Sequence, residues 1–200
     1  MISTILLAAG QSLRMKGENK LVKKIKGIPL IKYAVKNILA STVDEIIIVL
    51  GHEKDLIRNI IGLNRKIKFV YNKDFKKGIS SSIKIGLKSI SKKSEAFFIS
   101  LGDMPNVNQN IYNKLIKSRF KYNKKLKLQH KKEIIIPTFE GKNGNPILFS
   151  KFMKDKIMLV KNDLGASEII KLNKEKILNV PLNNKSIFLD FDTPDSFNSS

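Results

Sequence analysis

The stretch STILLAAGQSLRM, residues 3–15, carries the strongest indication of the fold. Residues 3–8 are a continuous apolar run, which is typical of a strand buried on both faces of a parallel sheet. Small residues and Gly10 follow, and they allow a ligand to approach backbone N–H groups. Arg14 and Lys20 would neutralise the charge of a bound phosphate, although a tight turn with solvated basic side chains is the simpler alternative. Together these residues favour a strand followed by a phosphate-binding loop.

Beyond this stretch, short β-rich runs alternate with segments whose apolar residues recur at helical spacing. The predicted strands are residues 45–50, 67–71, 96–101, 133–136 (stopped by Pro137), 146–149, 178–180 and 187–189. The predicted helices are residues 28–39, 53–61, 80–90, 111–122 and 166–172. This alternation predicts an α/β fold with a largely parallel sheet. Residues 1–200 are expected to form a single domain, since domains typically run to ~100–200 residues.

The composition excludes several classes of protein. The chain has 0 Cys, which excludes disulfides, Cys-ligated zinc and cysteine nucleophiles, and 42% hydrophobic residues exclude a wholly disordered chain. Its 2 histidines, His52 and His130, lie far apart, so a His-rich metal site is not expected. No apolar run approaches the ~18–20 residues of a membrane span, and the N-terminus lacks the basic flank of a signal peptide. We therefore expect a soluble cytoplasmic protein with no membrane partner.

The chain is strongly basic, with a formal net charge of +21. Almost all of the basic residues are Lys, whereas base readout in nucleic acids favours Arg. The lysines are spread along the sequence, and their densest stretch, residues 114–132, is typical of a solvated helix end and loop. A specific nucleic-acid partner is therefore not expected, and a nucleic-acid-binding module stays a remote alternative. A positive field would still attract small polyanionic substrates such as nucleotides.

Distinctive residues follow the first four predicted strands. They are Ala9-Gly10, Gly51-His52, Asn72 with Gly78 further on, and Gly102-Asp103. Ligands of parallel α/β sheets bind outside the carboxyl ends of the strands, where these residues are expected to meet. The sequence lacks the P-loop, the GxGxxG fingerprint, the GxSxG nucleophile elbow and the HExxH zinc motif.

Several motifs resemble those of the MobA-like nucleotidyltransferases, and the similarity is greatest to their molybdenum cofactor cytidylyltransferase (MocA-like) branch. Residues 7–15 with Lys20 resemble the opening loop of the family, and residues 101–105 (LGDMP) resemble its metal-binding motif. Further similar segments, in the family's order, are residues 49–52, Asn72 with 78–82 and 86–87, 144–149, 162–166 and 190–195. The resemblance thus extends along nearly the whole chain.

The resemblance implies both a fold and an activity. The fold would be a three-layer α/β/α sandwich with a mostly parallel twisted sheet, a Rossmann-like (GT-A-like) nucleotidyltransferase fold. The activity would be transfer of a nucleoside monophosphate from an NTP to a phosphorylated small-molecule acceptor, with release of pyrophosphate. CTP and a molybdopterin-type acceptor are the first expectation, and a molybdoenzyme in maturation is a further partner that the resemblance allows. GTP-dependent guanylyl transfer and a sugar-phosphate acceptor are the alternatives.

The resemblance also implies roles for individual residues. Lys20 and Arg14 would bind the β- and γ-phosphates and stabilise the departing pyrophosphate, so they are expected to be catalytic together with Asp103. Ser82 has an equally good interpretation as a helix cap. The full set of expected nucleotide-binding residues is Leu7, Ala8, Ala9, Gly10, Arg14, Lys20, Gly51, Asn72, Gly78, Ser80, Ser82 and Asp103.

Mg²⁺ is the expected cofactor, because it is bound through one or two carboxylates together with substrate phosphates. Asp103 directly follows a predicted buried strand and is the expected main ligand. Asp190 and Asp192 flank Phe191, and residues i and i+2 of a strand share a face, so both are candidates for the second ligand. The family pattern slightly favours Asp190, and Asp192 has an alternative role as a helix cap.

The acceptor side is where the sequence departs from the family. Asn145, Asp163, Gly165 and Ala166 are the expected acceptor-binding residues. Asn145 stands where His is common in the branch, and neighbouring Asn143 and Asn162 also differ from the usual residues. These differences concern the identity of the acceptor more than the chemistry, and nothing in the sequence indicates an oligomeric state.

A glycosyltransferase of related topology is a second enzyme class to consider. Such enzymes hold a metal–nucleotide complex with an Asp-x-Asp motif after a central strand. The Asp-x-Asp motif here is residues 190–192, near the C-terminus, whereas the predicted central strand ends in Asp103 alone. This placement disfavours the glycosyltransferase.

Overall fold

The computed structural model describes residues 1–15, 18–124, 126–127, 130–160, 166–193 and 197. The strands are β1 Ile2–Ala8, β2 Lys24–Ile25, β3 Ile28–Pro29, β4 Glu45–Leu50, β5 Ile67–Tyr71, β6 Ala96–Leu101, β7 Ile134–Phe139, β8 Lys142–Asn143, β9 Ile147–Ser150 and β10 Ile177–Pro181. The α-helices are α1 Leu30–Leu39, α2 Lys54–Ile61, α3 Ile79–Ser89, α4 Gln109–Asn123, α5 Lys154–Leu159 and α6 Ser167–Leu172.

The main sheet runs in the order β10-β7-β9-β6-β1-β4-β5, with β8 paired to β7, and β1 lies near its centre. The pairs β1–β4, β1–β6, β4–β5 and β7–β10 are parallel, whereas β9 is antiparallel to both of its neighbours. Every residue of β1 is buried, as the continuous apolar run predicts. The predicted mostly parallel α/β sheet is therefore confirmed.

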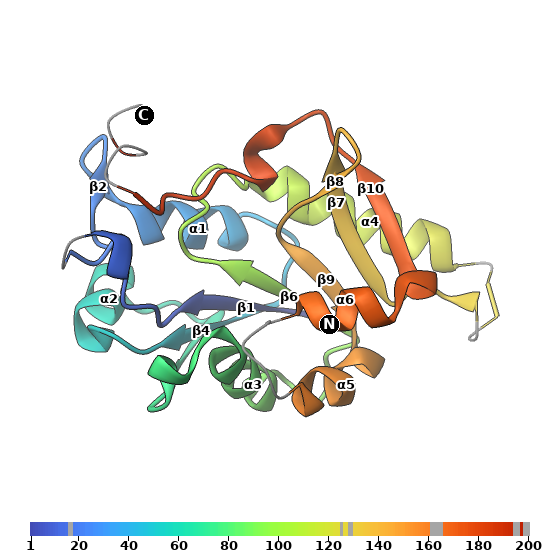
Figure 1. The fold of residues 1–200 in the computed structure, drawn as a ribbon, viewed down its shortest axis with the longest axis horizontal. Coiled ribbons are helices and arrows are strands. Elements are labelled where there is room, and N and C mark those ends of the chain that lie inside the picture. The colour runs from blue at the N-terminus through green and yellow to red at the C-terminus, as the bar shows by residue number, and fades with distance from the viewer. Residues whose placement is uncertain (16–17, 125, 128–129, 161–165, 194–196, 198–200) are drawn as a thin grey trace.

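Helices cover both faces of the sheet, which makes three layers (Figure 1). Alternate residues of β1 point to opposite faces, so Leu6 joins one hydrophobic core and Ile5 the other. Helices α1, α2 and α4 contribute to the core around Leu6, and α3, α5 and α6 contribute to the core around Ile5. The carboxyl ends of β1, β4 and β6 remain between these layers.

Three sequence predictions differ from the structure. Residues 187–189 were predicted as a strand, but a 3₁₀-helix lies at Lys185–Ile187, where the Asn184 side chain accepts a hydrogen bond from Ser186 N and caps the turn. Strand β7 continues past Pro137 to Phe139, since the Pro137 carbonyl faces Gly144 and the missing N–H is not needed by β10. The first predicted helix starts at Leu30, because Ile28–Pro29 pairs with β2 in a small hairpin. Helix α5 was not predicted.

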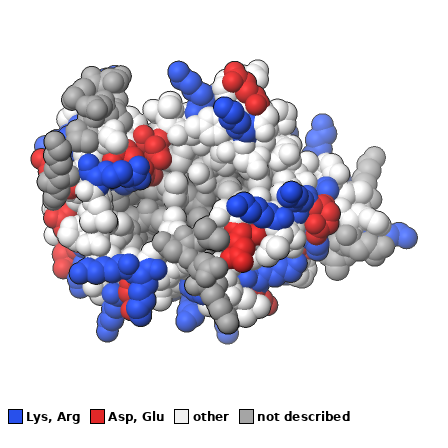
Figure 2. Space-filling model, in the orientation of Figure 1, with Lys and Arg blue, Asp and Glu red and all other residues white. Residues whose placement is uncertain are grey.

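None of the described helices is long and apolar enough to cross a membrane. On the face shown in Figure 2, basic side chains are scattered over several elements instead of forming one continuous patch. This distribution agrees with the interpretation of the lysines as solvated surface residues.

Candidate functional site

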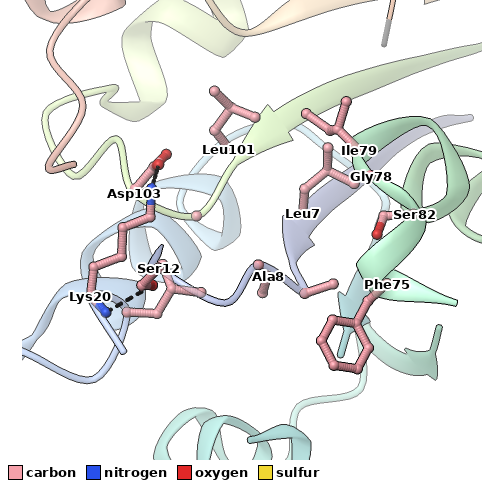
Figure 3. A pocket seen from close by; sticks show the side chains of 14 residues that line it. Leu7, Ala8, Ser12, Lys20, Phe75, Gly78, Ile79, Ser82, Leu101 and Asp103 are labelled. Carbon is pink, nitrogen blue, oxygen red and sulfur yellow. Dashed lines mark hydrogen bonds and ion pairs between the residues drawn. The ribbon is translucent and has the colours of Figure 1, made fainter. Parts of the chain in front are cut away.

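A cavity of about 260 Å³ opens at the carboxyl ends of β1 and β6 (Figure 3). Its floor is the loop after β1, and its walls are contributed by the loop after β6 and by the start of α3. It is lined by Leu7, Ala8, Ala9, Gly10, Ser12, Lys20, Leu21, Phe75, Gly78, Ile79, Ser82, Leu101, Gly102 and Asp103. The cavity therefore lies where ligands of parallel α/β sheets bind.

Hydrogen bonds between its own residues hold the loop after β1 in place. Ser12 has a φ of 54°, in the left-handed region, and its carbonyl accepts a hydrogen bond from Met15 N at 2.8 Å. Its Oγ accepts a second hydrogen bond from Lys20 N at 3.1 Å. Met15 is 2% exposed and anchors the far end of the loop in the core. These contacts fix the backbone from which the Lys20 side chain extends.

Asp103 is positioned by the strand before it. Gly102 N donates to Leu7 O at 3.1 Å, which extends the β1–β6 pairing by one residue. A side chain at position 102 would come within 2.9 Å of Ile31, so glycine allows this close approach. The next residue, Met104, is 4% exposed and packs in the core. The Asp103 carboxylate is thus held rigidly at the edge of the cavity.

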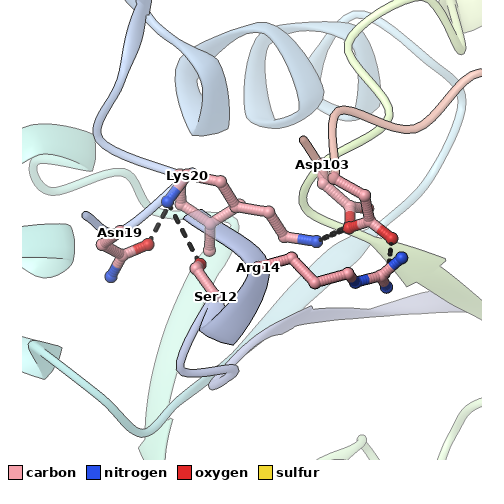
Figure 4. Close-up of polar contacts among 7 residues, drawn as sticks. Ser12, Arg14, Asn19, Lys20 and Asp103 are labelled. Carbon is pink, nitrogen blue, oxygen red and sulfur yellow. Dashed lines mark hydrogen bonds and ion pairs between the residues drawn. The ribbon is translucent and has the colours of Figure 1, made fainter. Parts of the chain in front are cut away.

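The ammonium group of Lys20 lies between two carboxylates (Figure 4). It donates to Asp103 Oδ2 and to Asp192 Oδ1, while Arg14 Nη2 donates to Asp192 Oδ2 at 2.6 Å. Burial lowers the pKa of Lys20, but the charges of Asp103 and Asp192 outweigh it and raise the pKa above its ordinary value. Burial tends to raise the pKa of Asp192, but the hydrogen bond from Lys20 and its charge outweigh burial and lower this pKa below its ordinary value. Lys20 is therefore firmly cationic at neutral pH.

The C-terminal segment reaches the site through a backbone contact. Phe191 N donates to Asp103 O at 3.1 Å, and the Phe191 side chain is 6% exposed in the core. This contact places Asp190 and Asp192 beside Asp103. Partial burial and repulsion from Asp192 and Asp103 raise the pKa of Asp190, which shows that the three carboxylates share one field.

The chemistry of these residues fits a divalent cation. Asp103 Oδ1 is buried and has no hydrogen-bond partner among the described residues, while its other oxygen faces Lys20. A buried carboxylate oxygen without a donor suits a hard cation such as Mg²⁺. Within the described ranges no cluster of three or more acidic or His residues is arranged around a metal position.

The structure brings most of the expected nucleotide-binding residues together. Those that line the cavity are Leu7, Ala8, Ala9, Gly10, Lys20, Gly78, Ser82 and Asp103. Those that do not line it are Arg14, Gly51, Asn72 and Ser80.

Each of these four has a physical reason to lie outside the cavity wall. Arg14 has a side chain that is 72% exposed and reaches the site only through Asp192. Gly51 lies beneath the loop, and a side chain there would come within 2.6 Å of Ala9 O. Asn72 is 1% exposed, so it supports the wall from behind, and Ser80 is 9% exposed on the first turn of α3.

The structure places none of the described acceptor-binding candidates in the wall of the cavity. Asn145 is half-buried, and its N–H donates to Ile187 O at 3.0 Å. Ala166 is the N-cap residue of α6 and packs against the core around Ile5. Neither lines the cavity. Asp163 and Gly165 lie outside the described residues.

The sequence analysis missed several residues of the cavity wall. These are Ser12, Leu21, Phe75, Ile79, Leu101 and Gly102. Ser12 and Gly102 directly adjoin predicted site residues, so their positions after β1 and β6 were an available signal. Phe75 comes from a 3₁₀-helix at Phe75–Lys77, and no local pattern marks it as part of the wall. Its ring lies 6.3 Å from that of His52.

Solved structures of other proteins share this fold. A Mycobacterium tuberculosis protein matches with a TM-score of 0.83 at 19% identity, over 99% of this chain and 96% of that one. A nucleotidyl transferase from Methanothermobacter thermautotroptrophicus matches with a TM-score of 0.80 at 17% identity, over 100% of this chain and 95% of that one. A manganese complex of the Mycobacterium protein matches with a TM-score of 0.78 at 18% identity, over 99% of this chain and 96% of that one.

The sequence itself is similar to characterised relatives. The Escherichia coli protein named molybdenum cofactor cytidylyltransferase is 26% identical over 196 residues, which cover 98% of this chain and 93% of that protein. The model of the MobA-like NTP transferase domain matches residues 4–177. The loop after β1 and the aspartate after β6 lie within that match, whereas Asp190 and Asp192 lie beyond its end. The chain therefore belongs to the MobA-like NTP transferase domain family.

Proposed function

We propose that the protein transfers CMP from CTP to a phosphorylated, molybdopterin-type acceptor and releases pyrophosphate. Membership of an NTP transferase family supports the class of reaction. The name of the Escherichia coli relative, which is similar over nearly the full length of both chains, supports CTP and the acceptor. The observation that carries the proposal is the meeting of Lys20 and Asp103 at the edge of the cavity.

In the proposed reaction, a phosphate oxygen of the acceptor attacks the α-phosphorus of the nucleotide. A new P–O bond forms there, and the bond from the α-phosphorus to the bridging oxygen breaks. Pyrophosphate leaves with that oxygen and its electron pair. The protein needs no nucleophile of its own, so its task is to align two polyanions and reduce their repulsion.

Lys20 is suited to hold the leaving phosphates, because its ammonium group is cationic and only partly exposed at the cavity edge. Arg14 adds a second positive charge from the more exposed side of Asp192. The backbone of Ala8, Ala9 and Gly10 lies open to the cavity and would contact the nucleoside. Positive charge at the leaving group stabilises the transition state more than the ground state.

A divalent cation is part of the proposal, and Mg²⁺ is the expected ion. Asp103 would be its main ligand, with Asp190 and Asp192 as the candidates for the second ligand. The ion would supply neutralisation of phosphate charge when bound. The manganese complex of a protein with the same fold makes a divalent ion a reasonable component.

Pyrophosphate release by the purified protein tests the proposal. CTP, GTP, ATP and UTP are each supplied with Mg²⁺ and with a panel of molybdopterin forms and sugar phosphates. We expect release with CTP and a molybdopterin form only. Release with GTP would show that GTP is the nucleotide donor instead of CTP, and release with a sugar phosphate would show that the acceptor is a sugar phosphate. If no combination of nucleotide and acceptor releases pyrophosphate, the proposed function is wrong.

A further inference from the structure

Asn72 lies behind the cavity wall, at the end of β5, and its side-chain amide contacts three groups. Asp74 N donates to Asn72 Oδ1 at 3.0 Å. Asn72 Nδ2 donates to Ser81 Oγ at 2.8 Å and to Ser82 Oγ at 3.0 Å. Asn72 is 1% exposed, so it exchanges no contact with solvent. It joins the end of β5 to the first turn of α3.

The backbone N–H of Asp74 determines which way the amide faces. An N–H group can only donate, so the oxygen of Asn72 must face Asp74 and the nitrogen must face the two serines. Both serine hydroxyls are therefore acceptors toward Asn72, and each must send its own proton elsewhere. The direction of these protons follows from the chain itself.

The two serines differ in where that proton can go. Ser81 Oγ donates to Gly78 O at 2.8 Å or to Asp74 O at 3.1 Å, so its hydrogen bonds are complete within the protein. Ser82 is 4% exposed and lines the cavity, and among the described residues no acceptor contacts its hydroxyl proton. The Ser82 proton is thus left to point into the cavity.

The surroundings of Ser82 indicate which part of a ligand it would meet. Figure 3 shows Ser82, Ile79 and Phe75 on the side of the cavity opposite to Lys20 and Asp103. The apolar side chains suit a flat ring, whereas the charged groups suit phosphates. Every nucleobase carries ring nitrogens or carbonyl oxygens that accept hydrogen bonds.

We propose that Asn72 is a positioning residue that makes Ser82 a hydrogen-bond donor to the nucleobase. This inference rests on the proposed function, because it needs a nucleotide in the cavity. Asn72 does not touch the nucleotide; it acts by holding the Ser82 hydroxyl as an acceptor. It therefore differs from a residue that only stabilises the loop between β5 and α3.

Calorimetric titration with CTP, GTP, ATP and UTP, in the presence of Mg²⁺, tests the inference. Ser82→Ala removes the donor and is expected to raise the Kd of the preferred nucleotide about 5–10-fold. Asn72→Asp keeps the acceptor for Asp74 N but replaces the amine by an oxygen, which turns the Ser82 proton away from the cavity. Its expected effect equals that of Ser82→Ala. Ser81→Ala is the matched control, with an unchanged Kd.

Two comparisons separate positioning from a merely structural role. Asn72→Ala only releases the Ser82 hydroxyl, so it is expected to weaken binding less than Asn72→Asp although it removes more hydrogen bonds. In a Ser82→Ala background, neither substitution at Asn72 is expected to raise the Kd further. If Asn72→Asp does not fold, Asn72→Ala in the two backgrounds provides the same comparison.

The outcomes distinguish the two proposals. If the unaltered protein binds no nucleotide, the proposed function fails and this inference fails with it. If it binds nucleotide and Ser82→Ala binds equally well, only the inference is overturned. Equal losses from Asn72 substitutions with and without Ser82 would also overturn it, since they would show a structural effect.

Discussion

Polar groups gather at each end of strand β1, and the two sets differ in how they are paired. At the amino end, Ser3 Oγ donates to Glu45 Oε1 at 2.5 Å, and Ser91 N donates to the same oxygen at 2.7 Å. Ile2 N donates to Asp44 Oδ2 at 2.6 Å. These donors and acceptors satisfy one another, so this end of the strand is a structural connection between β1, β4 and the start of β6.

At the carboxyl end, two polar groups beside the cavity lack a hydrogen-bond partner among the described residues. Asp103 Oδ1 has no partner among the described residues, and Ser82 accepts a hydrogen bond without a described acceptor for its own proton. Lys20 carries its charge between two carboxylates at the rim. Buried polar groups are normally paired, so unpaired ones beside a cavity are available to a ligand. The polar groups named at the amino end are thus paired, whereas two at the carboxyl end lack a described partner beside the cavity.

The largest expected effect comes from Asp103→Ala. Loss of the carboxylate at the carboxyl end should lower the rate of pyrophosphate release by ~10³-fold or more, since the proposed metal ligand would supply several kcal/mol of transition-state stabilisation. The thermal unfolding midpoint should change little. Asp44→Ala, at the paired end, is the control and should retain the rate. A near-normal rate for Asp103→Ala would show that Asp103 does not hold the ion.

The next largest effect is expected for Lys20→Gln. Removal of one charged group that stabilises the leaving pyrophosphate should cost ~10²–10³-fold in rate. Steady-state pyrophosphate release at saturating nucleotide measures this. Lys23→Gln serves as control, because Lys23 forms a more exposed ion pair with Glu18 at 3.5 Å and lies off the cavity. Equal rates for the two variants would contradict the role of Lys20.

Glu45→Ala should lower the stability of the protein without changing the rate, in contrast to Asp103→Ala and Lys20→Gln. The substitution leaves the N–H of Ser91 without its acceptor and removes one acceptor of the Ser3 hydroxyl, which keeps its contact with Ser94 Oγ. The free energy of unfolding should therefore fall by about 1–3 kcal/mol in denaturant titrations. The rate of pyrophosphate release per folded molecule should not change. A large loss of rate would contradict the prediction that residues at the amino end of β1 act only on stability.

The smallest effect is a dependence of stability on acid. Lys20 holds the pKa of Asp192 below its ordinary value of 3.8 against the opposing effect of burial. A lowered pKa means that the stabilisation is complete above the ordinary value and is lost as the pH falls through the folded-state pKa. Unfolding of the unaltered protein and of Asp192→Asn, compared from about pH 6 down to about pH 2, measures it. We expect the difference in unfolding free energy to be constant at the upper end and to shrink at the lower end. A difference that does not change with pH would show that Asp192 is not stabilised by this pairing.

Much of the site could be predicted because it follows directly from strand ends. Ala9 and Gly10 come after β1 and Asp103 comes after β6, so an apolar run followed by a small or acidic residue was sufficient to locate them. The walls could not be predicted in the same way. Phe75 enters the cavity from a 3₁₀-helix, and Asn72 lies behind the wall although it ends a strand as Asp103 does. Whether a residue at a strand end faces the ligand depends on the elements that pack over it.

The sequence by itself determined the α/β class, the succession of the main strands and helices along the chain, and which small and acidic residues follow the strands. Continuous apolar runs and helical patterns of apolar residues are local, so they can be recognised without contacts. Only the tertiary structure decided that Lys20 contacts Asp192, 172 residues away in the chain, and that Asn72 faces Ser82 instead of the cavity. Such pairings depend on how distant segments pack around the same core, because side-chain contacts across the chain are set by the packed geometry and leave no periodic signal in the sequence.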